Sequence, residues 1–356
     1  MKKLLLIIIP FLLCGCYDYN ELNDLAIISG VAIDYINEEY VVTFEVLLTK
    51  KQGEEQSSTG SYTISSKANT VYEAFAKNGK SIEKVPYFDH IETVIISEDI
   101  ARNHLEEVSE YLIRSSKFRN EFYMVISTTE AKDLLNNTSE EVNVVSSYIV
   151  GLLENNNRTL SAAYYAPFVE VLSNILSKRE DAILSTFSLD DDKIILSGMG
   201  LLHNYELKEI LNLEDASIIN LLNNFHANTT SFVSTCDKGK TVITVYDSKF
   251  DVLEEKDKIS VKASINARIQ EDNCDYNLKD INSYQELQKK FQKIMENRIN
   301  HVIKILQDNK TDVLKLRSKF YKKYRYDDND AWLNKNIDYN IDLKINKKGL
   351  IFDLEE

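Results

Sequence analysis

Two alternating stretches near the C-terminus constrain the fold more than any other feature of this chain. In residues 259–269 every odd position is apolar and every even position is polar, and the same alternation returns in residues 337–345. Such alternation is typical of a strand with one buried face. Between them lies a long stretch whose apolar residues recur on one helical face, and Ser283 to Glu286 fit a capping box at its start. The pattern predicts an antiparallel sheet covered on one face by long helices.

The rest of the chain predicts a mixture of strands and helices without an internal repeat. Strands are predicted over residues 25–35, 40–48, 91–96, 122–127 and 241–246. A helix is predicted over residues 69–78, and Gly79 ends it. A second helix is predicted to follow an N-cap at Ser97, and a third is predicted over residues 207–222. The fold class that follows is α+β.

Three mixed α/β domains are predicted, over residues 25–188, 189–255 and 256–356. The pattern changes near Asp190–Asp192, and the last boundary precedes the first alternating strand. Because the chain has only three prolines and ten glycines, no Pro/Gly-rich linker separates these parts. The domains must therefore abut through short connections.

The N-terminus has the features of an export signal. Lys2 and Lys3 precede an apolar run over residues 4–13, which is too short to span about 30 Å of hydrocarbon. The run ends in Leu-Cys-Gly-Cys, which resembles a bacterial lipobox with Cys16 as the acylated first residue of the mature chain. We therefore expect a signal peptide over residues 1–15 and a lipidated tether over residues 16–24. Two acyl chains would hold the protein stably on a lipid bilayer outside the cytoplasm.

The charge balance argues against nucleic acid as a partner. Removal of Lys2 and Lys3 from 42 basic residues leaves 40 against 56 acidic ones, a net charge of −16. After cleavage and acylation only Cys236 and Cys274 remain, both in polar surroundings. A disulfide outside the membrane and two separate thiols both stay open at this point.

Several segments resemble one known family. The stretch CYDYNELNDLAIISGVAID, directly after the lipobox, is similar to the start of the Ger(x)C spore-germination lipoproteins. The positions that fit are Asp18, Glu21, Asn23, Asp24, Leu25, Ala26 and Asp34, while Tyr17 replaces a tryptophan. The likeness continues through HIETVIISEDIARNHLEEVSEYLIRSSKFR, LSGMGLLHNYELKEILNLED and the C-terminal helices and final strand. Where the family often has Asp-hydrophobic-x-Gly, this chain has Asp312-Val-Leu-Lys315.

The resemblance implies a three-domain, non-enzymatic subunit of a nutrient-germinant receptor. Such a subunit would be tethered through Cys16 to the outer face of the spore inner membrane, beside two membrane-embedded partners of the A and B type. Nine residue steps separate Cys16 from Leu25, at most about 30 Å when extended, so the first domain would lie close to the membrane. Because Leu25 and Ala26 are expected to enter the core, Asn23 and Asp24 are the predicted partner-binding residues.

No motif of a known active site, metal site or cofactor site occurs in the chain. The five histidines are scattered, and adjacent Glu98 and Asp99 are better explained by a helix start than by a catalytic pair. The acidic runs 190–192 and 327–330 lack the spacing of a calcium loop and predict solvated turns. No catalytic residue, metal ligand or cofactor is predicted.

The basic and aromatic residues of 317–326 allow two interpretations. They could contact phosphate headgroups, or they could form a helix with an aromatic core face and basic edges, which we favour. For the whole chain the main alternative function is an extracytoplasmic solute-binding lipoprotein of a transporter, which predicts two lobes and a ligand cleft. A surface hydrolase is the third, and the lack of a nucleophile or metal constellation weighs against it.

Overall fold

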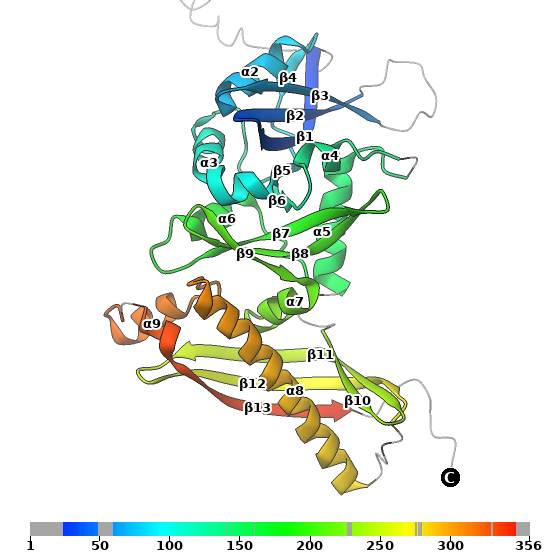
Figure 1. Cartoon of the computed structure of the whole chain (residues 1–356), viewed down its shortest axis with the longest axis vertical. Helices are drawn as coiled ribbons and strands as arrows, with labels where there is room; N and C mark the ends of the chain where they lie inside the picture. Colours follow the sequence, from blue (N-terminus) through cyan, green and yellow to red (C-terminus); the bar gives the residue numbers. More distant parts are fainter. Residues whose placement is uncertain are drawn as a thin grey trace, which may run out of the picture.

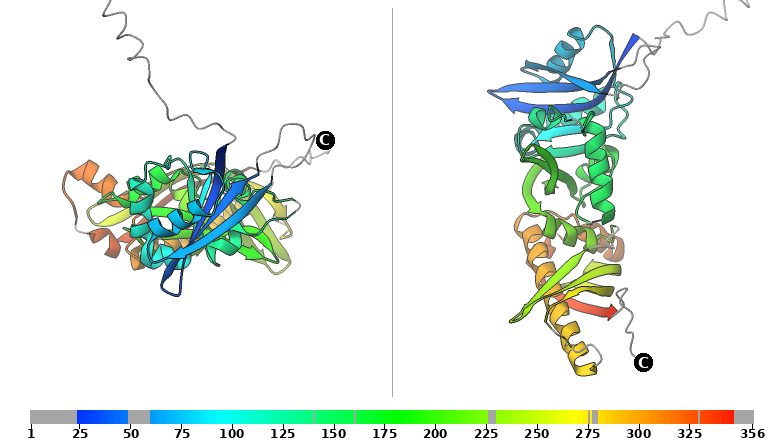
Figure 2. Two further views of the ribbon diagram at one scale, coloured as in Figure 1. Left: turned by 90° about the horizontal axis from the view of Figure 1, so that it is seen from above. Right: turned by 90° about the vertical axis from the view of Figure 1, so that its right-hand side faces the viewer.

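The strands and helices form two sheets that follow one another along the long axis of the molecule (Figure 1). The computed structural model describes residues 24–48, 60–139, 141–159, 161–225, 230–274, 276, 280–328 and 330–346. The predicted signal peptide, Cys16 and Asn23 lie outside these residues. The first strands lie at one end and the C-terminal sheet at the other, and the right-hand view of Figure 2 shows the same stacking from the side.

The large sheet has the strand order β3-β2-β1-β5-β6-β7-β8-β9, and β4 also pairs with β1. Its strands are β1 (Leu25–Ile36), β2 (Glu39–Leu47), β3 (Ser61–Ala68), β4 (Val85–Tyr87), β5 (Thr93–Ser97), β6 (Tyr123–Ser127), β7 (Ala182–Asp190), β8 (Lys193–His203) and β9 (Glu206–Asn212). The central strands β1, β5, β6 and β7 are parallel, and antiparallel hairpins extend the sheet on both sides. The predicted first hairpin is confirmed: Asn37 and Glu38 form its turn with φ of 52° and 63°.

Helices cover both faces of the large sheet. They are α2 (Val71–Lys80), α3 (Leu105–Arg114), α4 (Ala131–Leu135), α5 (Val145–Thr159), α6 (Phe168–Ile175) and α7 (Leu213–Leu222), and a π-helical turn, η2 (Ile100–His104), precedes α3. Neighbouring residues of β1 alternate between two cores, because side chains along a strand point to opposite faces. Val31 and Ile33 pack in the core with α2 and α3, whereas Ala32 packs in the core with α4 and α5.

The C-terminal sheet confirms the predicted pattern of alternation. Its order is β10-β11-β12-β13, with bounds Ser231–Cys236, Gly239–Glu254, Lys258–Asp272 and Asn336–Asn346. The odd residues of β12 from Ile259 to Ala267 are buried, and they share a core with Leu287, Phe291 and Met295 of the long helix α8 (Ile281–Asp308). The α+β fold class is therefore confirmed, with a helix over one face of this sheet.

One strand direction differs from the prediction of an antiparallel sheet. β13 pairs with β12 in parallel, with Ile259 opposite Ile337 and Ile265 opposite Leu343. The pairs β10–β11 and β11–β12 are antiparallel. The reason is that α8 crosses the sheet and returns the chain to the end where β12 began, as a parallel connection requires.

Three predicted segments also have different bounds. Residues 207–222, predicted as one helix, form β9 up to Asn212 and α7 only afterwards, because the first part pairs with β8. Helix α2 continues through Gly79 to Lys80. Helix α8 begins at Ile281, because the side chain of Asp280 caps it by accepting a hydrogen bond from the Ser283 amide at 2.8 Å.

A buried ionic contact, here named the joint, connects the large sheet with the C-terminal part. The Arg317 side chain, in α9 (Leu316–Tyr324), donates to the Asp181 carboxylate just before β7 at 2.8 Å. The same carboxylate accepts from the backbone amide of Asp312 at 2.6 Å, and the Asp312 carboxylate accepts from the amides of Leu316 and Arg317. The side chains of Asp181 and Asp312 are 3% and 0% exposed.

Two outer ion pairs accompany the joint. Arg179 forms two hydrogen bonds to the Asp327 carboxylate, at 2.6 and 3.0 Å, and its guanidinium lies 3.8 Å from the centre of the Tyr321 ring. Lys315 pairs with Glu180 at 3.0 Å. Three successive residues before β7 are thus bound to the segment that follows α8.

The division into three domains stays a prediction. In hydrogen bonding, the described residues form two sheets, and both predicted internal boundaries fall close to hairpin turns. The boundary after residue 188 lies near the turn between β7 and β8, and the boundary after residue 255 lies in the turn between β11 and β12.

Candidate functional site

Asp24, the predicted contact residue within the described part of the chain, lies at the N-terminal end of the large sheet. It is exposed and directly precedes β1. Of the two residues expected to enter the core, Ala26 is buried and Leu25 is half-buried. Leu25 lies opposite Val85 in the parallel pair of β1 and β4, so Asp24 is close to the start of β4.

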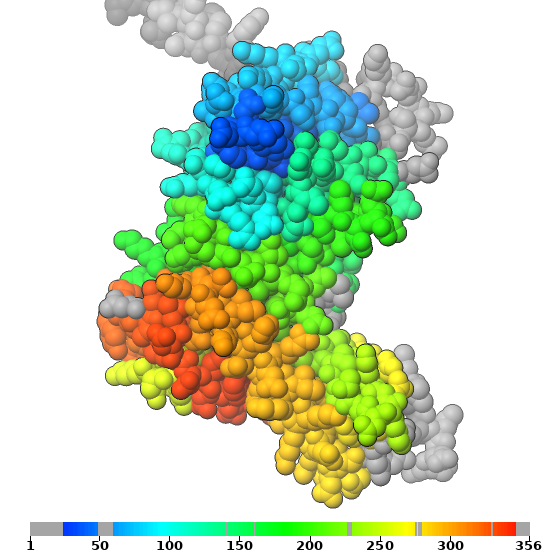
Figure 3. Space-filling model, in the orientation of Figure 1, coloured from blue at the N-terminus to red at the C-terminus, as the bar shows by residue number. Residues whose placement is uncertain are grey.

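An apolar hollow, here named the end hollow, opens next to Leu25 with a volume of about 180 Å³. Its lining residues are Leu25, Ala26, Val46, Leu47, Leu48, Tyr62, Ile82, Glu83 and Lys84. Leu48 and Tyr62 are 52% and 44% exposed, and Val85, which follows Lys84 in the chain, is 52% exposed. Figure 3 shows this end of the molecule at the top. The surface nearest to the predicted tether therefore exposes apolar side chains.

A buried carboxylate fixes the strands behind this surface. Glu45 of β2 accepts hydrogen bonds from the backbone amides of Val145 and Ser146, at 2.6 and 3.1 Å, and from the Ser29 and Ser61 hydroxyls at 2.9 and 3.0 Å. The negative charge thus lies at the N-terminus of α5, where free amides and the helix dipole favour an anion. Glu45 therefore anchors α5 to the first hairpin.

A second carboxylate binds the next helix in the same way. Asp34 of β1 accepts from the amides of Ala131 and Lys132, at 2.6 and 2.9 Å, at the start of α4. Burial raises the pKa of Asp34 to about 6, although the two amide hydrogen bonds act in the opposite direction.

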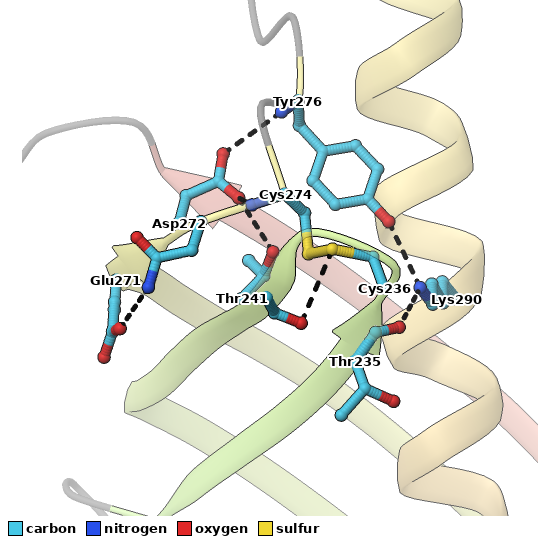
Figure 4. Close-up of a disulfide and its surroundings, with 10 residues drawn as sticks. Thr235, Cys236, Thr241, Glu271, Asp272, Cys274, Tyr276 and Lys290 are labelled. Atoms are coloured by element: carbon cyan, nitrogen blue, oxygen red, sulfur yellow. Dashed lines mark hydrogen bonds between the residues drawn. A yellow bond between two sulfur atoms is a disulfide. The ribbon is translucent and has the colours of Figure 1, made fainter.

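A disulfide joins Cys236 to Cys274, with a Cα–Cα distance of 6.0 Å. It links the end of β10 to the segment after β12, and Figure 4 shows it beside α8. Lys290 of α8 donates to the Thr235 carbonyl at 3.0 Å and to the Tyr276 hydroxyl at 3.3 Å. The structure therefore decides the question that the sequence left open, in favour of a pair.

Two family descriptions together match almost the whole chain. Residues 18–189 match the family described as spore germination protein N-terminal domain, and residues 197–349 match the one described as spore germination B3/GerAC like, C-terminal. The chain belongs to the Ger(x)C family.

Individual members of the Ger(x)C family match to different extents. Spore germination protein KC of Bacillus subtilis (strain 168) is 24% identical, over 91% of this chain and 88% of that protein. GerQC of Bacillus cereus is 24% identical, over 89% of this chain and 89% of that protein. The putative spore germination protein YfkR of Bacillus subtilis is 32% identical, but its match spans 38% of this chain and only 37% of that protein. The crystal structure of the GerBC protein shares the fold, with a TM-score of 0.53 at 18% identity over 89% of this chain and 96% of that one.

Two residues of the stretch that resembles the Ger(x)C opening motif, Asp34 and Gly30, have structural roles. Asp34 caps α4, as described above. Gly30 lies where β1 passes close to α5: an added Cβ would be 2.9 Å from the Ser146 Cβ and 3.2 Å from the Glu45 carboxylate. A side chain there would push the helix from the strand, so the motif fixes the packing of β1.

The second Ger(x)C segment holds the helix after β5. The Ser97 hydroxyl accepts from the Ile100 amide at 3.3 Å, which agrees with the predicted N-cap. Glu98 pairs with Arg102 at 2.7 Å, and Arg102 also donates to the Leu207 carbonyl of β9 at 3.1 Å. The side chain of Asp99 instead accepts from Asn103. Glu98 and Asp99 thus have separate partners.

The backbone conformation of Lys315 explains why Ger(x)C proteins often have glycine at this position. Lys315 has φ of 60°, in the left-handed region that glycine adopts most easily. Asp312 is the buried carboxylate of the joint. No local pattern indicates this joint, because Asp181 and Asp312 are 131 residues apart.

The remaining candidate residues lie apart from one another. Among the residues that the structure describes, no three His, Cys, Asp or Glu side chains converge as they would around a metal ion. The turn 190–192 is exposed, as predicted, whereas Asp327 and Asp328 are bound in ion pairs. His226 lies outside the described residues.

The basic and aromatic segment is partly internal. Arg317 belongs to the joint, and Lys319 donates to the Val252 carbonyl at 3.0 Å. Phe320 is buried and packs with Tyr324 and Tyr326. These contacts agree with the interpretation as a helix with an aromatic core face.

No helix among the described residues has both the length and the apolar character needed to cross a bilayer.

Proposed function

We propose that the chain is the lipid-anchored, extracytoplasmic C-type subunit of a nutrient-germinant receptor, and that it acts by protein–protein contact rather than by catalysis. Its place is the outer face of the spore inner membrane, where acylated Cys16 enters the bilayer. Its partners are the two membrane-embedded subunits of the A and B type, and Asn23 and Asp24 lie in the contact.

The observation that carries this proposal is the surface at the N-terminal end. Asp24 is exposed, and the adjoining end hollow displays Leu48 and Tyr62 at 52% and 44% exposure. A tether of at most about 30 Å between Cys16 and Leu25 keeps this surface near the membrane. Exposed apolar side chains grouped in this way are typical of a protein-contact site.

The disulfide supports the proposed compartment. Cys236 and Cys274 are bonded, and disulfides persist outside the reducing cytosol. This observation is independent of the lipobox and agrees with it.

The anchor is tested by fractionation of sporulating cells. Cys16→Ala should release the protein from the membrane fraction, because the acyl chains are lost. A variant that stays fully in the membrane fraction would refute the lipid anchor.

The partner contact is tested by recovery of the epitope-tagged full-length protein from detergent-solubilised spore membranes. Mass spectrometry should identify two polytopic subunits, and Asp24→Lys should reduce their recovery without lowering the melting temperature. Asp257→Lys, the same change of charge at the exposed turn between β11 and β12, should have no effect. Recovery of a transporter permease instead would favour a solute-binding lipoprotein.

A further inference from the structure

Helices α2 and α3 form a groove that none of the functions above uses. Tyr72 of α2 is 68% exposed, and its ring lies edge-on to that of Tyr111 of α3, with 6.4 Å between the ring centres. The two rings form a ridge with a hollow on each side, because both tyrosines line both hollows. The helices lie near the N-terminal end of the molecule (Figure 1).

The first hollow, here named the aromatic hollow, has a volume of about 420 Å³. Five aromatic side chains line it, together with small apolar residues and the charged Asp89 and Lys117. Phe75 and Phe88 line it, and their rings are held in place by neighbours: Phe75 lies 4.7 Å from Tyr111, and Phe88 lies 5.1 Å from Phe118, between ring centres. Because these walls are packed against the core, the hollow is preformed. It offers a large apolar side chain a place out of water.

The second hollow is acidic and has a volume of about 620 Å³. It is lined by Tyr40, Tyr72 and Tyr111 and by the carboxylates of Glu107 and Glu110. Arg114, also in the lining, pairs with Glu110 at 2.7 Å. Among the described residues no cation pairs with Glu107, so the hollow keeps one uncompensated negative charge. Tyrosine rings beside a carboxylate favour an ammonium or guanidinium group.

The groove and the end hollow have lining residues that are neighbours in the chain. Val85 lines the aromatic hollow, and Ile82 to Lys84, the residues just before it, line the end hollow. A partner that meets the surface at Asp24 therefore has the groove within reach. The negative charge selects a basic partner, and the aromatic hollow beside it selects an apolar neighbour.

We propose that the groove between α2 and α3 binds a peptide segment of a partner subunit, with a large apolar side chain in the aromatic hollow and a nearby lysine or arginine against Glu107. This inference rests on the proposed function, since it needs a partner subunit on the same side of the membrane. It adds a second contact with a defined chemistry.

The test uses the full-length, lipidated protein in sporulating cells, with a photoreactive benzoylphenylalanine in place of Tyr72. Irradiation should produce one major adduct, and mass spectrometry should place it on a polytopic partner, in a segment that contains a lysine or arginine. The same photoreactive residue in place of Tyr326, which follows α9 and is 49% exposed, is the matched control and should not react with that segment.

A charge reversal separates this contact from a chance neighbour. Glu107 is exposed, so Glu107→Lys should leave the melting temperature unchanged and lower the adduct yield about tenfold, because like charges then meet at the rim. Glu107→Gln should lower it less. An unchanged yield with Glu107→Lys, or an adduct only on lipid or on a small molecule, overturns the inference.

The inference and the proposed function fail differently. If the wild-type protein recovers its two partners but the Tyr72 position reacts with neither, the groove is not their contact while the receptor assignment stands. If no polytopic partner is recovered at all, the proposed function fails first.

Discussion

The two ends of the molecule differ in how their surfaces are completed. At the N-terminal end Leu48, Tyr62, Tyr72 and Val85 are all at least 44% exposed, and hollows of about 420 and 620 Å³ flank Tyr72. The C-terminal sheet also has exposed apolar residues, such as Val233, but the hollow lined by Val233 has only about 140 Å³. The N-terminal end is therefore the better surface for a partner.

The edges of the C-terminal sheet are covered by side chains of α8. Tyr284 and Gln292 donate to the carbonyls of Ile345 and Ile341 in β13, both at 2.9 Å. Lys290 donates to a carbonyl of β10, on the opposite edge of the sheet. A free strand edge invites pairing with another chain, so these contacts protect the sheet from it. The difference indicates that one end is built for contact and the other for stability.

The joint holds the two ends together, and its removal should have the largest effect. Arg317→Met removes the guanidinium from the buried carboxylates of Asp181 and Asp312, although His203 still contacts Asp181 at 2.9 Å. The loss should lower the free energy of unfolding by about 3–5 kcal/mol. The urea midpoint should fall accordingly, and hydrogen exchange should increase in α9 and at the start of β7.

A matched control for this change is Arg114→Met. Arg114 pairs with Glu110, but the two side chains are 78% and 56% exposed, so its loss should cost at most about 0.5 kcal/mol. If Arg317→Met cost less than about 1 kcal/mol, the joint would not be what couples the two ends.

Loss of the disulfide should act on the C-terminal end alone. Cys236 and Cys274 are separated by 38 residues. For a loop of that size, the Cys236→Ser, Cys274→Ser double variant should lose on the order of 2–4 kcal/mol in its free energy of unfolding. Hydrogen exchange should accelerate in β10 and at the end of β12 but stay unchanged in α2 and α3. An equal increase in α2 and α3 would show that the ends do not unfold separately. The wild-type protein with and without reductant provides the control.

Local periodicity explains which parts of the fold could be predicted. The strands β12 and β13 and the helix α8 were predicted because each has a clear apolar period of its own. The direction of β13 was not, since a period of two is the same in parallel and antiparallel strands. β9 was mistaken for a helix because Leu207, Ile210 and Leu211 have helical spacing, whereas pairing with β8 determines the observed strand.

The candidate site was less accessible to sequence reasoning. The exposed position of Asp24 was expected from its place before an apolar strand. The end hollow was not, because its walls come from four segments, around Leu25, Leu48, Tyr62 and Ile82. The groove beside Tyr72 likewise needs both α2 and α3. Contacts of this kind leave no local pattern, so only the folded chain reveals them.

The C-terminal end should also differ in its response to pH. Lys335 is bound to Glu254 at 2.6 Å and to Asp328 at 2.9 Å. Burial, followed by the hydrogen bond with Asp328, raises the pKa of Glu254 to about 8. For Asp328, burial acts to raise the pKa, but the hydrogen bonds from Glu254 and Lys335 outweigh it, and the pKa is lowered. At neutral pH Glu254 therefore holds a proton in the folded protein.

The sign of the effect follows from linkage. Because the pKa of Glu254 is higher in the folded protein than in the unfolded chain, its contribution to stability is full below about pH 4.5 and is lost as the pH rises to about 8. Glu254→Gln, which resembles the protonated form, should remove this loss. We expect the variant to gain on the order of 2 kcal/mol over wild type between pH 5 and pH 9, measured by urea unfolding. Asp34→Asn at the N-terminal end should gain less, because burial raises the pKa of Asp34 only to about 6. An equal gain would contradict a difference between the ends.

The smallest expected effect concerns the left-handed residue at the joint. Lys315 has φ of 60°, which costs a non-glycine residue about 1 kcal/mol. Its ion pair with Glu180 is partly exposed and contributes at most about 1 kcal/mol. Lys315→Gly removes both the backbone strain and the ion pair, so its free energy of unfolding should stay within about 0.5 kcal/mol of wild type. Lys315→Ala loses the ion pair and keeps the strain, so it should be about 1 kcal/mol less stable than the glycine variant in urea. If alanine were as stable as glycine here, backbone strain would not account for the glycine that Ger(x)C proteins often have at this position.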